Sequence, residues 1–511
     1  MPKSIVRVLC PILLAYFMMG VGSVMSETYY VDSAGGNDTG TGTSQSSPWG
    51  SLAKVNASRF KPGDRILFKS GSAWQGQLIV RSPGSEGAPI VIDRYGEGAM
   101  PLIDGGGKVE DVICLYNVQQ VEVRHLELTN HGAQPEVRRG VHIFLDNFGT
   151  AKHIVISGLF IHDVNGTNGV EHSHKDNGGI VFRTVGNQVP SRFDGLVIEG
   201  NIVWKVDRSA IVAESYHAMR SHWFPSTNVI IRDNYVENIG GDGIVPWATD
   251  SVLVEHNIAR NCNRRAGSYN AGIWPWSTDN SLFQLNEASF TRTTLDGEGF
   301  DSDYNSRNTL FQYNYSHDNE GGFMLICTPG DPTKEDGPGH IGNIGTLIRY
   351  NISRNDRTRI FHLAGAAENT TVHDNAVYVG SGLDVQMLAV TNWEGWADRA
   401  VFRDNFFYVE GTAHYGHEVS RKDGVYTISP GWGPAKAIVF EGNRYVGQHI
   451  DRPEDPKGSV EELGEMPRLD WDEPQFDPAN PDGFSTFLSK HRDWMLKLFE
   501  SQFGRPVRLG R

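Results

Sequence analysis

Four carboxylates fall within eight residues of this chain: Asp296, Glu298, Asp301 and Asp303. Cleavage of a glycosidic bond needs one carboxylic acid that protonates the leaving oxygen and a second carboxylate that acts as nucleophile or as base toward water. Because crowded carboxylates repel each other, one of them is expected to have a raised pKa and to hold a proton near neutral pH. The cluster therefore has the composition of a sugar-cleaving site.

A fifth carboxylate, Glu320, follows in Asp318-Asn319-Glu320-Gly321-Gly322, at the turn entering the next repeat of the chain. We predict Asp301 as nucleophile or base and Glu320 as general acid, with Asp303 tuning the pair. Asp296 and Glu298 are the reserve candidates for either role.

Tryptophans accompany these carboxylates, in Gly272-Ile273-Trp274-Pro275-Trp276 and at Trp247 one repeat earlier. Flat indole rings suit the apolar faces of pyranose sugars. We therefore predict that Trp247, Trp274 and Trp276 bind substrate. The alternative is that long loops fold over this face and bury the indoles.

Histidines and basic residues are predicted to border the same groove. His172 and His174, beside Lys175, lie in a polar loop that could bind sugar, supply a base or hold a metal. We include Arg183 and His362 among the candidate substrate-binding residues. A solvated polar loop explains His172 and His174 equally well, because their spacing of two is a weak metal pattern.

Two other interpretations of the carboxylate cluster remain open. Several hard oxygen ligands in a short span could hold Ca²⁺, although the fixed spacing of a known calcium loop is missing. Aspartates in a turn-rich chain also cap turns by hydrogen bonding to the backbone. Sugar hydrolysis itself requires no cofactor, and we assign no metal ligands.

These residues sit in a loose repeat that is marked by asparagines in an apolar context, at intervals of 23 to 38 residues. A parallel β-solenoid has a tight bend in each coil, where a stacked Asn side chain can bridge unpaired backbone groups to the next coil. A β-sandwich does not need such a recurring residue. The repeated residues are Asn201, Asn234, Asn257, Asn286, Asn314, Asn351, Asn375, Asn405 and Asn443.

A second repeated pattern places a small residue before an apolar strand start, as in Gly243-Ile244, Gly272-Ile273, Gly299-Phe300 and Gly322-Phe323. Since neighbouring side chains of a strand face opposite sides, Ile273 and Phe300 would point inward. Trp274, Trp276, Asp301 and Asp303 would then point outward. This alignment places Met324 beside Asp301, Ile326 beside Asp303, and His362 two coils from Asp301.

With these patterns the chain, from about residue 29 to 447, resembles the right-handed parallel β-helix proteins of the pectate-lyase-like superfamily. Most of those proteins are secreted carbohydrate-active enzymes. The paired acids on adjacent coils look similar to those of β-helix glycoside hydrolases of the xylosidase and fucosidase type. The resemblance implies an all-β fold, a right-handed parallel β-helix with an N-terminal cap and a C-terminal helix.

The chain divides into four predicted segments. Residues 1–26 have basic residues, an apolar run and a small-residue cleavage site near Ser26, as in a secretory signal peptide. Residues 27–89 form an N-terminal cap and first coils, and residues 90–447 the catalytic β-helix. Residues 448–511 form an extended segment and a C-terminal capping helix, which either packs on the solenoid or covers its open end. The protein is therefore expected to be secreted or periplasmic.

The composition excludes some partners. A net charge of −15 argues against nucleic acid, which attracts clustered Lys and Arg. The apolar run near the N-terminus is shorter than a membrane span needs, so no integral membrane span is expected. Cys114, Cys262 and Cys327, which remain after removal of the signal, show no paired spacing, so no disulfide framework is expected.

Three functions remain. The first is a secreted glycoside hydrolase acting on a polysaccharide or oligosaccharide by a two-carboxylate mechanism. The second is a polysaccharide lyase or uronate epimerase, which needs a basic residue and cations around a uronic acid. The third is a non-catalytic carbohydrate-binding solenoid. The acidic and aromatic groove favours hydrolysis.

Overall fold

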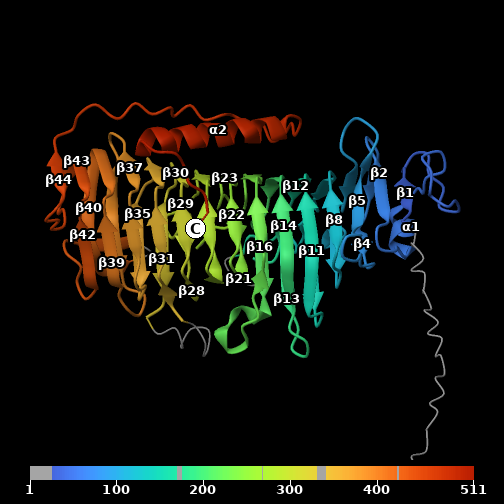
Figure 1. The fold of residues 1–511 in the computed structure, drawn as a ribbon, viewed down its shortest axis with the longest axis horizontal. Coiled ribbons are helices and arrows are strands. Elements are labelled where there is room, and N and C mark those ends of the chain that lie inside the picture. The colour runs from blue at the N-terminus through green and yellow to red at the C-terminus, as the bar shows by residue number, and fades with distance from the viewer. Residues whose placement is uncertain (1–25, 170–174, 268, 331–340, 423–424, 511) are drawn as a thin grey trace, which may run out of the picture.

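The computed structural model describes residues 26–169, 175–267, 269–330, 341–422 and 425–510. Parallel strands coil into an elongated β-helix, with the first coils at one end of the long axis and the last at the other (Figure 1). Each coil contributes to three sheets, and each strand pairs with its counterpart in the next coil. The predicted fold, an all-β right-handed parallel β-helix with an N-terminal cap and a C-terminal helix, is confirmed.

The site sheet carries the residues of interest and runs the length of the molecule. It ends in an antiparallel hairpin of β40 and β41. Its strands are β4 (Leu78–Val80), β7 (Asp111–Tyr116), β10 (Arg139–Asp146), β13 (Gly178–Val185), β16 (Ser209–Ser215), β20 (Ile244–Val245), β27 (Glu298–Ser302), β31 (Gly322–Thr328), β35 (Arg359–Gly365), β38 (Asp384–Thr391), the second half of β40 (Phe406–Lys422), and β41 (Val425–Ser429).

The second sheet follows the site sheet in each coil. Its strands are β1 (Thr28–Val31), β2 (Arg65–Lys69), β5 (Ile90–Tyr95), β8 (Val121–Arg124), β11 (Thr150–Ser157), β14 (Arg192–Glu199), β17 (Ser226–Thr227), β18 (Ile230–Arg232), β21 (Trp247–Asp250), β22 (Leu253–Glu255), β24 (Trp276–Asp279), β25 (Leu282–Gln284), β28 (Ser306–Arg307), β29 (Leu310–Gln312), β32 (Asn343–Ile344), β33 (Leu347–Arg349), β36 (Thr371–His373), β39 (Asp398–Arg403) and β42 (Lys436–Glu441).

The third sheet closes each coil and is covered by the C-terminal helix. Its strands are β3 (Ala73–Gln75), β6 (Leu102–Asp104), β9 (Glu127–Asn130), β12 (Phe160–Val164), β15 (Ile202–Val206), β19 (Tyr235–Glu237), β23 (Ile258–Arg260), β26 (Glu287–Ser289), β30 (Tyr315–His317), β34 (Ile352–Arg354), β37 (Ala376–Val379), the first half of β40, β43 (Arg444–His449) and β44 (Ser459–Glu461).

The predicted asparagine ladder lies at the bend between the second and third sheets. The side-chain amide of Asn286 donates to Asn314 Oδ1 at 3.0 Å and to the carbonyl of Val254, and Asn314 repeats this pattern toward Asn351. All nine predicted asparagines are at most 1% exposed, and the ladder ends on Asp455. Because each amide satisfies backbone groups of two coils, the ladder fixes the stacking register.

Helices cover only small parts of the solenoid. Helix α1 (Leu52–Ala57) lies near the N-terminal end, where Ser51 Oγ accepts from Lys54 N. Helix α2 (Phe484–Phe503) lies along the third sheet (Figure 1), where Trp494, Met495 and Phe499 pack on the aromatic residues of that sheet. The helix therefore packs on a flank of the solenoid, which is one of the two predicted placements, and does not cap an open end.

Two 3₁₀ turns, η2 (Tyr216–Ala218) and η3 (Arg220–His222), form an insert between β16 and β17.

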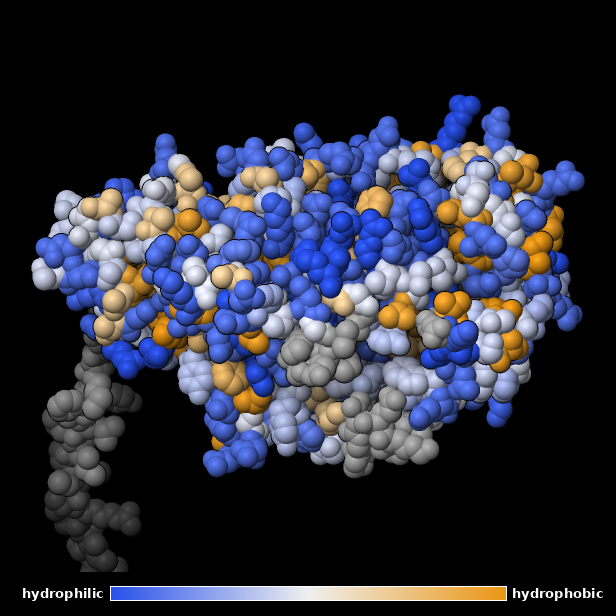
Figure 2. All heavy atoms as spheres, turned by 180° about the vertical axis from the view of Figure 1, so that it is seen from behind, coloured by the Kyte–Doolittle hydropathy of each residue, from blue (hydrophilic) through white to orange (hydrophobic). Residues whose placement is uncertain are grey.

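The face turned away in Figure 1 is mostly hydrophilic, with apolar residues in small groups (Figure 2). Among the described residues, no helix combines the length and the apolar character that a membrane crossing requires.

Candidate active site

The carboxylate cluster lies where the site sheet is narrowest. Between β20 and β27 the sheet continues only through single bridges of Ile273 to Ile244 and to Phe300. Pro246 and Pro275 follow these bridges, and a proline has no N–H to extend a ladder. Ile273 and Phe300 are fully buried in the solenoid core, so the predicted outward direction of the alternating residues is confirmed.

Asp301 and Asp303 project outward from this narrow point, beside Cys327 of the next coil. The Cys327 thiol donates to Asp303 Oδ1 at 3.0 Å and lies 3.9 Å from Asp301 Oδ1. Asp301 is only 4% exposed, whereas Asp303 is half-buried. Of the two carboxylates, Asp303 is therefore the more accessible to a ligand.

Burial and mutual repulsion raise the pKa values in this cluster. Desolvation and then the charge of Asp303 hold the pKa of Asp301 well above its usual range. Desolvation raises the pKa of Asp303 to about 6, against the opposing hydrogen bond from Cys327. Burial, followed by the charge of Glu298, likewise holds the pKa of Asp296 well above its usual value. Asp296 and Asp301 thus keep their protons to higher pH than a free aspartate does, while Asp303, with a pKa of about 6, is mostly ionised near neutral pH.

Glu298 is a buried carboxylate that is paired with Arg359. It is fully buried, and its Oε1 lies 3.3 Å from Arg359 Nη2 and 3.5 Å from His362 Nδ1. Burial alone would raise the pKa of Glu298, but Arg359 and His362 outweigh it and the pKa lies below its ordinary value. Glu298 therefore stays ionised, which does not fit its reserve role as general acid.

Asp296 is the second half-buried carboxylate of the cluster. It lies in the turn before β27, and its charge contributes to the raised pKa of Tyr426, which burial raises first. Tyr426 lines a cleft of about 680 Å³ together with Thr294, Arg359 and Gln386. Asp296 therefore lies within electrostatic range of a residue that lines a space of ligand size.

A buried polar wall closes the other side of the cluster. Lys175 Nζ donates to Asp242 Oδ2 at 2.7 Å and lies 4.6 Å from the centre of the Trp274 ring. Trp274 Nε1 donates to Asp242 Oδ1 at 3.0 Å, and Arg208 also pairs with Asp242. Because Trp274 is 5% exposed and its ring faces Lys175, the predicted stacking of this indole on substrate does not fit.

Trp247 and Trp276 remain as a half-buried aromatic pair. Their ring centres lie 4.8 Å apart, in register on neighbouring coils, and Tyr304 meets the edge of Trp276 at 5.5 Å. Asp303 N donates to the carbonyl of Pro275, just as Trp276 N donates to that of Pro246. The indoles and Asp303 therefore form one outward column, as predicted.

Glu320 lies apart from this cluster. Its carboxylate accepts from Arg292 Nη1 at 2.5 Å and from Thr293 N at 2.8 Å. Burial opposes these contacts, but the hydrogen bond from Arg292 outweighs it and the pKa of Glu320 falls below its ordinary value. A carboxyl group with a lowered pKa is ionised at neutral pH, which does not favour the predicted general-acid role of Glu320.

The predicted basic and histidine ligands have other partners. Arg183 is ion-paired with Glu214 and lies 3.5 Å from Asp176. His362 is 2% exposed, and its Nε2 lies 2.8 Å from Thr391 Oγ1. Burial and the charge of Arg359 lower the pKa of His362 to about 4. His362 therefore orients Glu298 and does not border the groove, which corrects its predicted role.

His172 and His174 lie outside the described residues.

Cys327 was not predicted to lie in the site, because the predicted pairing register between β27 and the next strand is wrong by one residue. Asp301 pairs with Leu325 and Phe300 with Met324, so the predicted neighbours Met324 and Ile326 are wrong. Leu325 in turn pairs with His362, which therefore lies two coils from Asp301, as predicted. The shift arises because Gly322, with a φ of 144°, aligns with Glu298 and not with Gly299.

Asp242 was also missed, although Gly241-Asp242-Gly243 repeats the Gly-acid-Gly pattern of Gly297-Glu298-Gly299.

The cluster offers limited support for a metal ion. One ligand atom from each of Asp301, Asp303 and Cys327 can be chosen so that all lie within 4.8 Å of one another. Ca²⁺ prefers six to eight oxygen ligands, and a protonated thiol is not one of them. Burial, followed by the charge of Asp301, holds the pKa of Cys327 well above its ordinary value, so the thiol keeps its proton. This donor set fits Ca²⁺ poorly.

Comparison with known proteins points to one group of enzymes. No protein-family model matches the chain. A lacto-N-biosidase from Bifidobacterium longum subsp. longum is 30% identical over 478 residues, covering 74% of this chain and 28% of that relative. A solved GH136 lacto-N-biosidase from Eubacterium ramulus is 25% identical with a TM-score of 0.60, covering 83% of this chain and 67% of that one. Its native-protein structure is 24% identical, with a TM-score of 0.59 and coverages of 86% and 68%.

These likenesses confirm the predicted resemblance to β-helix carbohydrate-active enzymes. The similar proteins named above are lacto-N-biosidases, which are glycoside hydrolases. The chain spans just over a quarter of the length of the curated relative.

Proposed function

We propose that this protein is a glycoside hydrolase that cleaves an oligosaccharide at the Asp296–Asp303 site. The observation that carries the proposal is the pairing of two accessible carboxylates of opposite protonation. Asp303 has a pKa of about 6, and Asp296 has a pKa held well above its usual range. An ionised base and a protonated acid in one cluster are what hydrolysis of a glycosidic bond requires, and the charge of Asp303 acts on Asp296.

In this mechanism Asp296 protonates the leaving oxygen, and Asp303 acts as nucleophile or as base toward water. These roles replace the predicted Asp301 and Glu320. Asp301 is more deeply buried, and burial followed by the charge of Asp303 holds its pKa well above its usual range. While Asp301 keeps its proton it adds no negative charge to the cluster, so Asp303 can ionise more easily.

The aromatic pair supports a sugar as the ligand. Trp247 and Trp276 lie in the same outward column as Asp303, with part of each indole exposed. Such ring faces stack on the apolar faces of pyranoses. The name of the B. longum relative points to release of a lacto-N-bioside unit, so we take an oligosaccharide that ends in this disaccharide as the substrate.

Among the described residues, the cations near the cluster that a lyase could use are already paired. Lys175 pairs with Asp242, Arg183 with Glu214, and Arg359 with Glu298. A cation paired with a protein carboxylate is not available to neutralise the carboxylate of a uronic acid without breaking that pair. Hydrolysis is accordingly the better match.

Secretion is part of the proposal. Residues 1–26 carry the pattern of a secretory signal peptide with cleavage near Ser26, and they lie almost wholly outside the described residues. Oligosaccharide substrates would then be met outside the cytoplasm.

The experiment is a product assay on the full chain. The chain is incubated with a chromogenic lacto-N-bioside, with longer oligosaccharides that end in the same disaccharide, and with uronic-acid polymers. Release of an intact saccharide with a new reducing end supports hydrolysis. An absorbance rise from an unsaturated product on the uronic polymers, without hydrolysis of the other substrates, would show a lyase and refute the proposal.

A further inference from the structure

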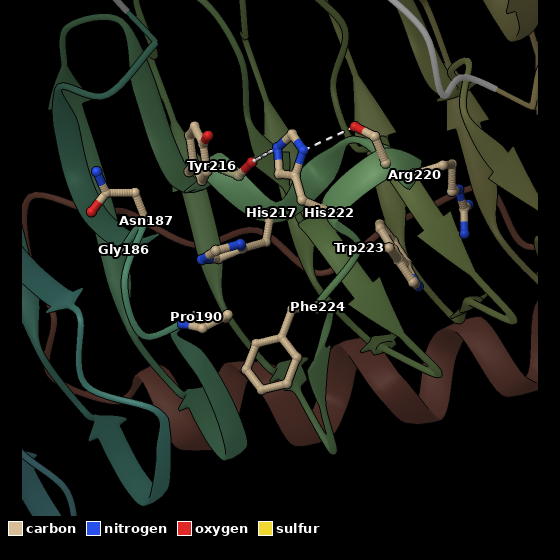
Figure 3. A pocket seen from close by; sticks show the side chains of 10 residues that line it. Gly186, Asn187, Pro190, Tyr216, His217, Arg220, His222, Trp223 and Phe224 are labelled. Atoms are coloured by element: carbon tan, nitrogen blue, oxygen red, sulfur yellow. Dashed lines mark hydrogen bonds between the residues drawn. The ribbon is translucent and has the colours of Figure 1, made fainter.

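A separate cleft lies beside the catalytic column, between the insert that follows β16 and a turn of the preceding coil. The insert supplies η2, η3, Trp223 and Phe224, and the turn between β13 and β14 supplies Gly186 to Pro190. The cleft encloses about 470 Å³, which is within the range of small-ligand sites. Figure 3 shows His217 extending between the turn and Phe224, with Tyr216 and His222 above it.

The insert is held rigidly against the coils that carry the proposed catalytic residues. Arg220 donates to both carboxylate oxygens of Asp279, at 2.7 and 3.0 Å, and to the Asn305 backbone carbonyl at 2.8 Å. The carbonyl of Ala218 accepts from Ser277 and from Asn305. Ser277 follows Trp276, and Asn305 lies two residues after Asp303. A cleft fixed in this way is pre-organised, so little ordering entropy opposes binding.

Aromatic surfaces dominate the walls of the cleft. Tyr216 is 54% exposed; it stacks on His222 at 4.6 Å and meets His217 at a steep angle at 5.4 Å between ring centres. Trp223 and Phe224 are half-buried on the same insert, with Arg220 over the Trp223 ring and Arg192 over the Phe224 ring. The exposed tyrosine ring is therefore the aromatic surface of the cleft that best suits the apolar face of a sugar ring.

His217 adds a neutral hydrogen-bond donor to these surfaces. Ser191 N donates to His217 Nε2 at 3.2 Å, so the ring proton is placed on Nδ1. Nδ1 has no hydrogen-bond partner, although the side chain is 2% exposed. Burial, with the nearby His222, lowers the pKa of His217, so the ring stays neutral. Because His217 lines the cleft, we take its unpaired Nδ1–H as the donor to a ligand hydroxyl group.

The charges of the cleft favour a neutral ligand. Arg220 is the cation among its lining residues, and its guanidinium is already paired with Asp279. Asn187 and Ser221 are exposed polar residues at the rim. Ring faces, a neutral donor and an amide together match an uncharged sugar and not a phosphate or a uronic acid.

We propose that this cleft is a second saccharide-binding site, which holds a neutral sugar of the oligosaccharide remote from the bond that is cleaved. The inference rests on the proposed function in taking the ligand to be the same oligosaccharide. Binding there would add affinity for longer chains, and part of that energy would be available to the reaction at Asp303.

The first test measures binding without turnover. In the Asp303→Asn background, a longer oligosaccharide that ends in lacto-N-biose is titrated calorimetrically, and Tyr216→Ala should weaken binding about tenfold. Tyr216→Phe, which keeps the ring face, should restore most of it. Tyr95→Ala removes a half-buried tyrosine from β5 of the second sheet, away from the cleft, and should have no effect. Equal affinities for Tyr216→Ala and Tyr95→Ala, or no binding of the oligosaccharide, would overturn the inference.

The second test separates this inference from the proposed function. The ratio of kcat/KM for the long oligosaccharide to that for the chromogenic lacto-N-bioside should fall about tenfold in Tyr216→Ala. If the chain hydrolyses both substrates and this ratio is unchanged, the second site is refuted while the hydrolase stands. If nothing is hydrolysed but Tyr216→Ala still weakens binding, the proposed function fails and the saccharide site stands.

Discussion

At the scale of single residues, the site works through differences in protonation. Asp303 is the carboxylate whose pKa, about 6, lies nearest to neutral pH. The Cys327 thiol and the Tyr304 backbone N–H both donate to its Oδ1 and keep this pKa from rising further, and the thiol has the larger effect. A thiol that holds its proton stabilises the ionised form of its partner. Cys327 is therefore a positioning residue for Asp303.

Replacing Cys327 by Ala should shift the acidic limb of the rate profile. In the parent protein, kcat/KM should fall as the pH drops through about 6, because Asp303 takes up a proton. Without the thiol the pKa of Asp303 rises, so the limb should move to higher pH by about half a unit or more. Cys114→Ala, on distant β7, serves as control. An acidic limb that is identical in Cys327→Ala and in the parent protein would contradict this role.

Asp303→Asn should also stabilise the protein at neutral pH. The folded pKa of Asp303 lies above its unfolded value, so ionisation costs stability as the pH rises from about 4 through about 6. The amide carries no such cost. Thermal unfolding should show a Tm that is higher by about 2 °C at pH 7.5, with the difference fading toward pH 4. A lower Tm of the variant at pH 7.5 would show that ionised Asp303 is not destabilising.

At the scale of elements, the asparagine ladder sets which residues come together. Each rung satisfies backbone and side-chain groups of two coils, so the coils stack in one register. That register carries Trp276 beside Trp247 and Asp303 beside them. The ladder thus positions the site from the opposite side of the solenoid.

Asn314→Ala should destabilise the chain by about 3 kcal/mol or more. The substitution leaves buried partners of Asn314 unpaired, including Asn286 Nδ2 and the carbonyl of Phe283, and each unpaired group costs about 1–3 kcal/mol. Asn480→Ala, at an exposed asparagine, is the matched control. Denaturant unfolding followed by circular dichroism would compare the two, and similar midpoints would mean that the ladder contributes little.

At the scale of the whole molecule, the sequence predicted the fold far better than the roles within the site. The asparagine ladder and the small-apolar strand starts are periodic, so their inter-coil contacts could be inferred from spacing alone. Glu320 could not be judged in this way, because Arg292 reaches it from 28 residues earlier. The contacts of Asp242 with Lys175 and Trp274 likewise depend on loops of unequal length. Which residues such loops bring together cannot be inferred from spacing in the sequence.

The predicted strand register was also wrong by one residue at Gly322, which shows at a single position that sequence spacing does not decide the alignment. A glycine before an apolar residue was aligned with Gly299, although the structure aligns Gly322 with Glu298. Its φ of 144° is accessible to glycine and strained for other residues, so backbone conformation and not the apolar pattern decides the alignment. The error moved Cys327 out of the predicted site.

The most direct test of the central claim is the hydrolysis rate of three matched variants. Asp296→Asn and Asp303→Asn should each lower kcat on the lacto-N-bioside substrate about a thousandfold, with substrate binding retained. Glu320→Gln, which alters a carboxylate outside the cluster, should keep near-parent activity. The account would be contradicted if Glu320→Gln lost activity while either aspartate variant kept it.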